Sequence, residues 1–280
     1  MIELLQYEFM RNALIAGVLA SIATGIIGTY VIVKRIVFIS GGISHASFGG
    51  IGLGYFAGIN PILGALVFTI ASALGIGLVS RRTRQREDTS IGMFWVVGMA
   101  IGIIFIGLTP GYAPDLFSYL FGNILAIPRS DIFLMVALDG IILTTVFLLY
   151  KEFLALSFDE EFTNLRGVDV EKLYLVLLTM VALTVVVLIR IVGVILVIAL
   201  LTVPAAIAVQ HLKNIGKIMV LSAILGAVFT TSGLWISYLL DLASGATIIL
   251  VSVVGFLVSS LYRGLRHRVK YDIKQEKMIN

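Results

Sequence analysis

The chain of 280 residues is 59% hydrophobic and only 13% charged, and its formal net charge is +4. Soluble domains carry about 25% charged residues, so this composition excludes a soluble globular protein and indicates a chain whose surface faces lipid. The sequence has no cysteine, which excludes disulfide bridges and thiolate metal ligands.

The apolar residues form continuous runs of about twenty, the length that an α-helix needs to cross a membrane. Strands of a membrane β-barrel would instead show segments of about ten residues with alternating hydrophobicity, so we predict an all-α polytopic membrane protein. A single transmembrane domain of about nine helices (8–9) accounts for residues 1–280. The spans are expected near residues 13–33, 36–58, 62–80, 91–108, 131–150, 173–189, 191–210, 218–240 and 246–262. The apolar run at 117–127 is too short to cross, and we expect an interfacial or re-entrant segment there.

The Lys and Arg residues are distributed unevenly over the predicted loops. If the N-terminus is outside, all 20 of them fall on the inner side except Arg11, Arg129 and Arg190. Cytoplasmic loops of membrane proteins carry such an excess of positive charge. We therefore predict an outside N-terminus and a cytoplasmic C-terminus.

The second predicted span, 36–58, carries a small residue at every fourth position. A stripe of this kind lets helix backbones approach closely in a membrane, so we expect it to pack against other helices. The stripe consists of Gly42, Ala46, Gly50, Gly54 and Gly58.

Two ionisable side chains, His45 and Asp139, lie inside the nine predicted spans. An ionisable group in a membrane is costly, and each is therefore a functional candidate. His45 lies about 14 Å along its helix, near the midplane where transport sites are found, and it is flanked by Ser44 and Ser47. The alternative is a neutral imidazole that is hydrogen-bonded to a neighbouring helix. For Asp139 we prefer a protonated structural carboxyl.

A longer polar segment at 157–167 has the pattern of a short helix. Ser157 and Glu160 fit a capping box, and Gly167 is suited to the position just past the helix end. The apolar residues fall at helical spacing on one face, which must dock either on the protein's own helix ends or in the groove of a partner. The apolar stripe is Phe158, Phe162 and Leu165; the acidic first turn is Asp159, Glu160 and Glu161; and Arg166 lies at the end.

The sequence contains neither the G-x-x-x-x-G-K-[ST] phosphate loop nor an H-E-x-x-H motif. We therefore expect no nucleotide hydrolysis or zinc-protease activity in this chain, which is not predicted to be an enzyme. Energy for transport would come from a partner or from an ion gradient.

Five segments in the same order along the chain resemble the zinc/manganese/iron ABC permease family, often called ABC-3. They are the second-helix signature at 40–54, an ED-x-x-IG motif at 87–92, the FDEEFT loop at 158–168, the R-x-VG helix at 190–206 and the external loop at 241–246.

The resemblance implies the permease subunit of an ATP-driven importer for a divalent transition metal, with zinc preferred and manganese or iron as alternatives. It also implies a homodimer, one cytoplasmic ATPase subunit per protomer, an external metal-binding protein and a bacterial or archaeal cytoplasmic membrane. The metal is then cargo rather than a permanently bound cofactor, and no nucleic acid is involved.

The resemblance places His45 on the metal path, with Ser44 and Ser47 beside it, and implies that 158–167 contacts the ATPase. Many members of the family carry Asp four residues before the histidine, on the same helix face, whereas this chain has Gly41. Imidazole without thiolate is compatible with Zn²⁺, and Mn²⁺ or Fe²⁺ remain alternatives.

Two other functions compete with this one. A gradient-driven secondary carrier would need inverted repeats and carboxylates near the midplane, and Asp139 is the one acid available there. An ABC permease for an organometallic or vitamin cargo would share the partners without using the histidine.

Overall fold

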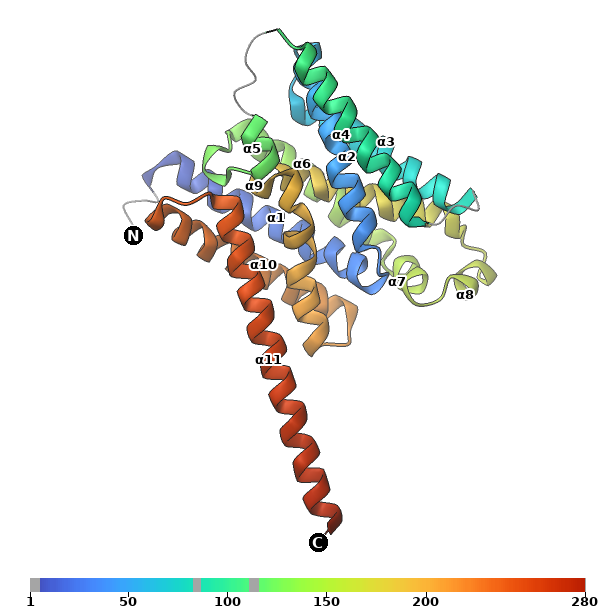
Figure 1. Ribbon diagram of the computed structural model, residues 1–280. Helices are drawn as coiled ribbons and strands as arrows, with labels where there is room; N and C mark the ends of the chain where they lie inside the picture. The colour runs from blue at the N-terminus through green and yellow to red at the C-terminus, as the bar shows by residue number, and fades with distance from the viewer. Residues whose placement is uncertain (1–5, 83–86, 111–115, 280) are drawn as a thin grey trace.

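The computed structural model describes residues 6–82, 87–110 and 116–279, and these residues form helices and connecting turns with no strand (Figure 1). The elements are α1 (Glu8–Val33), α2 (Val37–Ala57), α3 (Pro61–Arg82), α4 (Glu87–Leu108), α5 (Leu116–Phe121), the 3-10 turn η2 (Ile124–Ala126), α6 (Arg129–Leu148), α7 (Tyr150–Phe158), α8 (Glu160–Leu165), α9 (Val170–His211), α10 (Ile215–Leu240) and α11 (Ser244–Ile279). The chain is thus an all-α polytopic membrane protein. α11 extends well past the other helices at its C-terminal end (Figure 1).

Seven of the described helices are long and apolar enough to cross a membrane, namely α1, α3, α4, α6, α9, α10 and the 244–265 part of α11. The sequence predicted about nine. One difference is α2, which has 21 residues, including His45, several glycines and three serines, and is not among these seven. The other is α9, where two predicted spans are joined.

The 42 residues of α9 would measure about 63 Å as one straight helix, roughly twice the thickness of a membrane's hydrocarbon core. The helix breaks at Gly193, whose φ of 74° and ψ of 164° are not helical. Glycine has no Cβ and adopts positive φ at little cost. The break lies just past the predicted boundary between residues 189 and 191.

The α9 helix forms the centre of the bundle, and α4 lies at its periphery. The most apolar window of α9 is 78% buried, against 17% for that of α4. α1, α2, α3, α10 and α11 all pack on α9. Burial from every side explains why the first half of α9 is apolar all round.

The break in α9 is filled by the short elements α5 and η2, which do not cross the bundle, as predicted for 117–127. A Cβ on Gly193 would lie 2.3 Å from the carbonyl oxygen of Leu120, and one on Gly245 would lie 2.3 Å from that of Phe121. Gly122, with a φ of 77°, faces the backbone of α9 equally closely. Three backbones therefore meet here, at what we call the α5 end of the bundle.

A buried ion pair fixes the same end. Arg190 Nε lies 2.8 Å from Asp131 Oδ2, and the two side chains are 13% and 8% exposed. The guanidinium also lies 5.1 Å from the ring centre of Tyr119. Pairing offsets the cost of removing both charges from water, so Arg190 anchors the end of the first half of α9.

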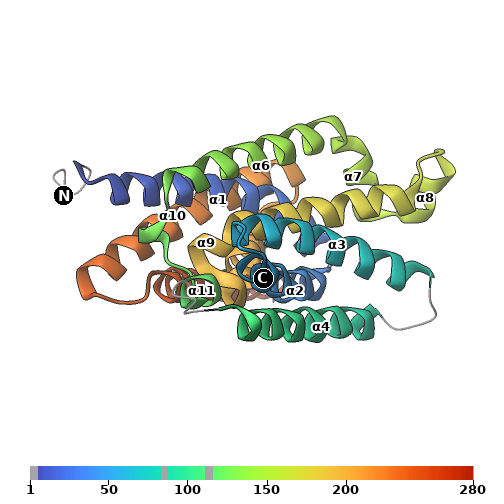
Figure 2. The same cartoon turned by 90° about the horizontal axis from the view of Figure 1, so that it is seen from above.

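The opposite end, which we call the α8 end, holds α7, α8 and the start of α9. Figure 2 shows α8 at the same end of the bundle as the C-terminal end of α3. The sequence predicted one short helix at 157–167, whereas the structure has α7 up to Phe158 and a separate α8 from Glu160.

Candidate functional site

His45 is buried in α2, with 8% of its surface exposed. Its Nδ1 lies 3.0 Å from the carbonyl oxygen of Gly41 one turn earlier. A carbonyl can only accept, so Nδ1 carries the hydrogen, and in a neutral imidazole Nε2 has the lone pair. The hydrogen bond is therefore to α2 itself and not to a neighbouring helix, and it leaves Nε2 as the nitrogen able to bind a metal ion.

The ring of His45 stacks on Trp95 of α4. The two ring centres are 3.8 Å apart and the planes are inclined by 19°. Sequence analysis did not single out Trp95, because nothing in the sequence indicated which face of α4 contacts α2.

Close approaches between α2 and its neighbours bring Trp95 to His45. A Cβ on Gly98 of α4 would lie 2.5 Å from the Cα of Ala46, and one on Gly50 would lie 2.2 Å from the carbonyl oxygen of Gly64 in α3. A Cβ on Gly42 would lie 2.5 Å from Cγ2 of Ile91, and one on Gly54 would lie 2.7 Å from the Cα of Pro61.

Gly58 does not belong to this packing stripe. It is the C-cap of α2 with a φ of 67°, and nothing lies within 4 Å of the position of its Cβ. The four-residue spacing of small residues includes Gly58 only because it continues past the end of α2. Glycine is favoured there by the left-handed backbone and not by helix packing.

Ser44 and Ser47 use their hydroxyl hydrogens within the bundle. Ser44 Oγ donates to the carbonyl oxygen of Val194 at 2.6 Å, beside the break in α9, and Ser47 Oγ donates to the carbonyl of Ser44. Their oxygens keep lone pairs. No group of three or more His, Asp or Glu side chains able to hold a metal ion occurs among the described residues, and His45 is therefore not part of such a group there.

The space in front of Gly41 is occupied. A Cβ there would lie 2.6 Å from Cδ1 of Ile198 and 3.9 Å from Cζ3 of Trp95. The position at which the family's Asp would begin is thus filled by side chains of α9 and α4.

Asp139 lies in α6, which packs on α1 and α9. The residue is 3% exposed, and neither carboxylate oxygen has a hydrogen-bond partner among the described residues. The structure does not bring Asp139 into a group with His45.

At the α8 end, Asp159 caps α8 by accepting a hydrogen bond of 2.9 Å from the backbone N–H of Phe162. The predicted capping box of Ser157 and Glu160 is therefore wrong. Ser157 lies within α7, and its hydroxyl donates to the carbonyl of Phe153 at 2.7 Å. Gly167 has a φ of 80°, as predicted for a residue just past a helix end.

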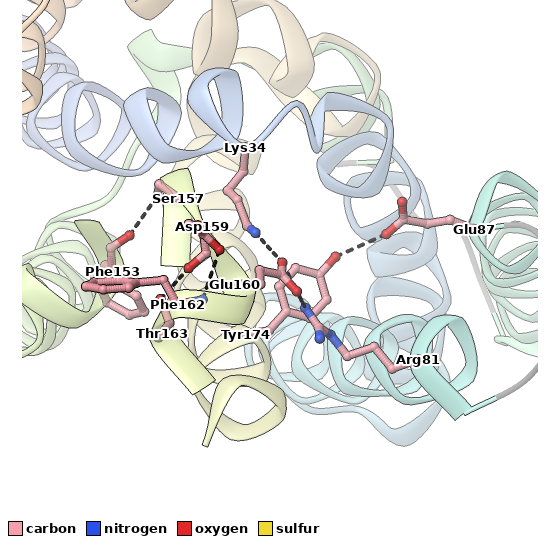
Figure 3. A network of polar contacts seen from close by, with 10 residues as sticks. All are labelled: Lys34, Arg81, Glu87, Phe153, Ser157, Asp159, Glu160, Phe162, Thr163 and Tyr174. Carbon is pink, nitrogen blue, oxygen red and sulfur yellow. Dashed lines mark hydrogen bonds and ion pairs between the residues drawn. The ribbon is translucent and has the colours of Figure 1, made fainter. Parts of the chain in front are cut away.

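Glu160 holds α8 against the bundle (Figure 3). Its carboxylate is ion-paired with Lys34, the C-cap of α1, and lies 3.1 Å from the guanidinium of Arg81 in α3. Burial raises the pKa of the Glu160 carboxyl, but Lys34 and Arg81 outweigh burial and hold that pKa below its ordinary value.

The same network reaches two more helices. The guanidinium of Arg81 lies 4.1 Å from the ring centre of Tyr174 in α9, and the Tyr174 hydroxyl donates to Glu87 of α4 at 3.1 Å. Ends of α1, α3, α4 and α9 are thus linked to α8 (Figure 3). Sequence analysis missed Lys34, Arg81, Tyr174 and Glu87, because pairs so distant in the chain leave no local pattern.

The predicted apolar stripe is divided between two helices, because Phe158 ends α7 and only Phe162 and Leu165 lie in α8. All three side chains face away from the bundle, and we keep the name α8 stripe for them. Phe158, Phe162 and Leu165 are 70%, 47% and 87% exposed, whereas Thr163 on the opposite face is 1% exposed. Arg166 covers one side of the Phe162 ring at 4.6 Å. A cavity of about 580 Å³ lies beside the helix, lined by Arg81, Glu160, Glu161 and Asn164 among others. The stripe is therefore not docked on the protein's own helix ends.

A bundle in which seven of the described helices are long and apolar enough to cross a membrane defines a multi-pass membrane protein. The chain belongs to the ABC 3 transport family, which matches residues 6–263. It is 51% identical, over 94% of each chain, to an uncharacterized membrane protein of Synechocystis. It is 38% identical, over 92% of each chain, to the manganese transport system membrane protein MntC of Listeria monocytogenes. In the solved structure of PsaBC from Streptococcus pneumoniae in complex with Fab, one chain superposes with a TM-score of 0.84 at 32% identity, covering 92% of this chain and 95% of that one.

Proposed function

We propose that this chain is the membrane-spanning permease subunit of an ATP-driven importer for a divalent transition metal ion, in one domain that comprises residues 1–280. The observation that carries the proposal is similarity over nearly the whole chain to proteins named for manganese transport, such as MntC. We therefore place manganese ahead of the zinc expected from sequence, with iron as a further alternative.

The proposed topology has nine spans, an outside N-terminus and a cytoplasmic α8 end. Seven helices were identified by length and apolarity, α2 adds one span, and the division of α9 into two halves adds another. The Gly193 break and the length of α9 support this division. Lys34 and Arg81 at the α8 end support the orientation, since basic residues favour the cytoplasmic side.

The α8 stripe is the proposed contact with a cytoplasmic ATPase subunit, which hydrolyses ATP on behalf of the permease. A helix of six residues is unstable alone. Its exposed Phe162 and Leu165, together with Phe158 at the end of α7, suit this segment to insertion into a partner's groove. A second permease copy, an external metal-binding protein and a bacterial or archaeal cytoplasmic membrane complete the proposed assembly.

His45 is the proposed ligand on the metal path, with the oxygens of Ser44 and Ser47 beside it. Its imidazole has a defined tautomer and a buried position, which are the properties expected of a metal-binding histidine. A transfer site must release its ion, so one nitrogen completed by water or carbonyl oxygens fits transport.

Mn²⁺ uptake into proteoliposomes that contain the permease and its cognate ATPase tests the proposal. We expect Mn²⁺ uptake to need both ATP and the ATPase. We also expect Zn²⁺ or Fe²⁺ to inhibit this uptake by competition. Uptake driven by an ion gradient without the ATPase would establish the secondary carrier instead. ATP-driven uptake of a corrinoid but of no free metal ion would establish the organometallic cargo.

A further inference from the structure

Trp95 is placed by the register of two glycine-rich helices. On α4, Ile91 lies against Gly42, Gly98 lies against Ala46, and Gly102 lies against the backbone of Phe48. Trp95 is one turn from both Ile91 and Gly98, on the same face of α4. The close approaches at neighbouring turns therefore hold the indole against His45 at a fixed height.

The imidazole is held at two points. The Nδ1 hydrogen bond to Gly41 fixes one ring atom, and the indole of Trp95, 3.8 Å away and nearly parallel, covers one ring face. A metal ion binds imidazole in the ring plane, along the Nε2 lone pair, so a group stacked on the face leaves that direction open. Rotation of the imidazole, in contrast, would have to displace the indole.

Trp95 cannot itself be a ligand, because the indole N–H only donates hydrogen bonds. It also lies close to the space in front of Gly41, which Ile198 fills. An aromatic face and an aliphatic side chain thus occupy the place at which a carboxylate would begin.

We propose that Trp95 is the positioning residue of the metal path, which holds the His45 imidazole by its flat face so that Nε2 is presented to the passing ion. This inference rests on the proposed role of His45 in metal transport. In this chain the imidazole is thus oriented by a backbone carbonyl and an aromatic ring, without help from an anion at position 41.

Two variants of Trp95 distinguish a flat face from mere volume. Trp95→Phe keeps an aromatic face, whereas Trp95→Leu fills space without one. Mn²⁺ binding to the purified permease–ATPase complex can be measured from the EPR signal of free Mn²⁺, independently of transport. We expect Trp95→Phe to stay within about threefold of the wild type and Trp95→Leu to weaken binding by about tenfold, as loss of an orienting group does at metal sites.

Trp95→Ala should weaken binding at least as much as Trp95→Leu, and Trp235→Phe serves as the control at the other tryptophan. If Trp95→Ala does not assemble, the comparison of Phe with Leu still decides the question. Equal binding by the Phe and Leu variants, or wild-type binding by Trp95→Ala, would overturn the positioning role. Wild-type Mn²⁺ binding and uptake by His45→Ala would instead overturn the metal path itself, whatever the Trp95 variants do.

Discussion

Glu160 in α8 and Lys34 at the end of α1 are 126 residues apart in the chain and form an ion pair. The Lys34 side chain is 11% exposed and the Glu160 side chain 40% exposed, so the pair lies at the boundary between the bundle and the solvent. Together with Arg81, it is the polar attachment of α8 to the bundle.

Glu160→Gln removes the charge that attracts both Lys34 and Arg81. We expect a loss of about 1 kcal/mol of stability, modest because the carboxylate is partly hydrated. Transport per ATP hydrolysed should fall further, since α8 is no longer held in place. Asp241→Asn, at an exposed position at the end of α10 and outside the 158–167 segment, is the control. Thermal unfolding in detergent and the ratio of Mn²⁺ uptake to ATP hydrolysis measure the two effects, and identical ratios for both variants would contradict this role of Glu160.

The lowered pKa of Glu160 sets the pH range of this contribution. A carboxyl whose pKa is lower in the folded state stabilises the fold at pH values above its unfolded pKa, about 4.3. The contribution is lost as the pH falls through the lowered folded value. The stability difference between wild type and Glu160→Gln should therefore be constant from pH 6 to pH 8, shrinking only below about pH 4. A difference that already declines between pH 8 and pH 6 would show that another group dominates.

Leu165→Ala and Phe162→Ala shorten exposed side chains of α8. Because these atoms are in water, the free energy of unfolding should change by no more than about 0.5 kcal/mol. The amount of ATPase that co-purifies should fall severalfold. Phe147→Ala removes a ring from α6 that is more exposed (82%) than that of Phe162 and should leave ATPase binding unchanged. Undiminished ATPase binding and transport in both α8 variants would refute the docking surface.

His45→Ala should reduce uptake by at least about tenfold, with the assembly and its ATPase intact. His45→Gln distinguishes a ligand from a structural hydrogen bond, because its amide can still donate to the Gly41 carbonyl. Gel filtration of the complex and Mn²⁺ uptake in proteoliposomes are the measurements. Full transport by the Gln variant would assign His45 a structural role.

Gly41→Asp introduces the carboxylate that many family members carry. Its Cβ would meet Cδ1 of Ile198 at 2.6 Å, the end of a flexible side chain, so Ile198→Val is added to make room. Oxygen ligands suit Mn²⁺, and we expect binding to tighten about tenfold, or about 1.4 kcal/mol. Gly41→Asn with Ile198→Val is the neutral control of the same shape. Equal affinities for Asp and Asn would show that position 41 does not face the ion.

The helices could be predicted from the sequence because apolar runs of spanning length have few alternatives, and most predicted boundaries lie within a few residues of those in the structure. The left-handed backbone of Gly167 was also predicted, since local capping rules suffice there. The cap of α8 was misplaced because Ser157 and Asp159 are both good capping residues. Which one caps depends on where α7 ends.

The contacts that define the candidate site depend on tertiary packing. The sequence indicated that His45 was a candidate, but the rotation of α4 about its axis decides whether Trp95 or another side chain meets it. That rotation is set by Gly98 and Gly102 lying against α2. The attachment of Glu160 likewise depends on three helix ends meeting, which no local pattern records.

The meeting of Gly122, Gly193 and Gly245 at the α5 end also constrains the order in which the protein can mature. A ribosome delivers α5 and η2 long before the second half of α9 or the start of α11 exists. The surface that receives α5 is made of backbone around Ile191, Val192 and Gly193, so it forms only once that later part of the chain has been inserted. Until then the α5 segment has no α9 backbone to pack against, so this end of the protein is completed late in biogenesis.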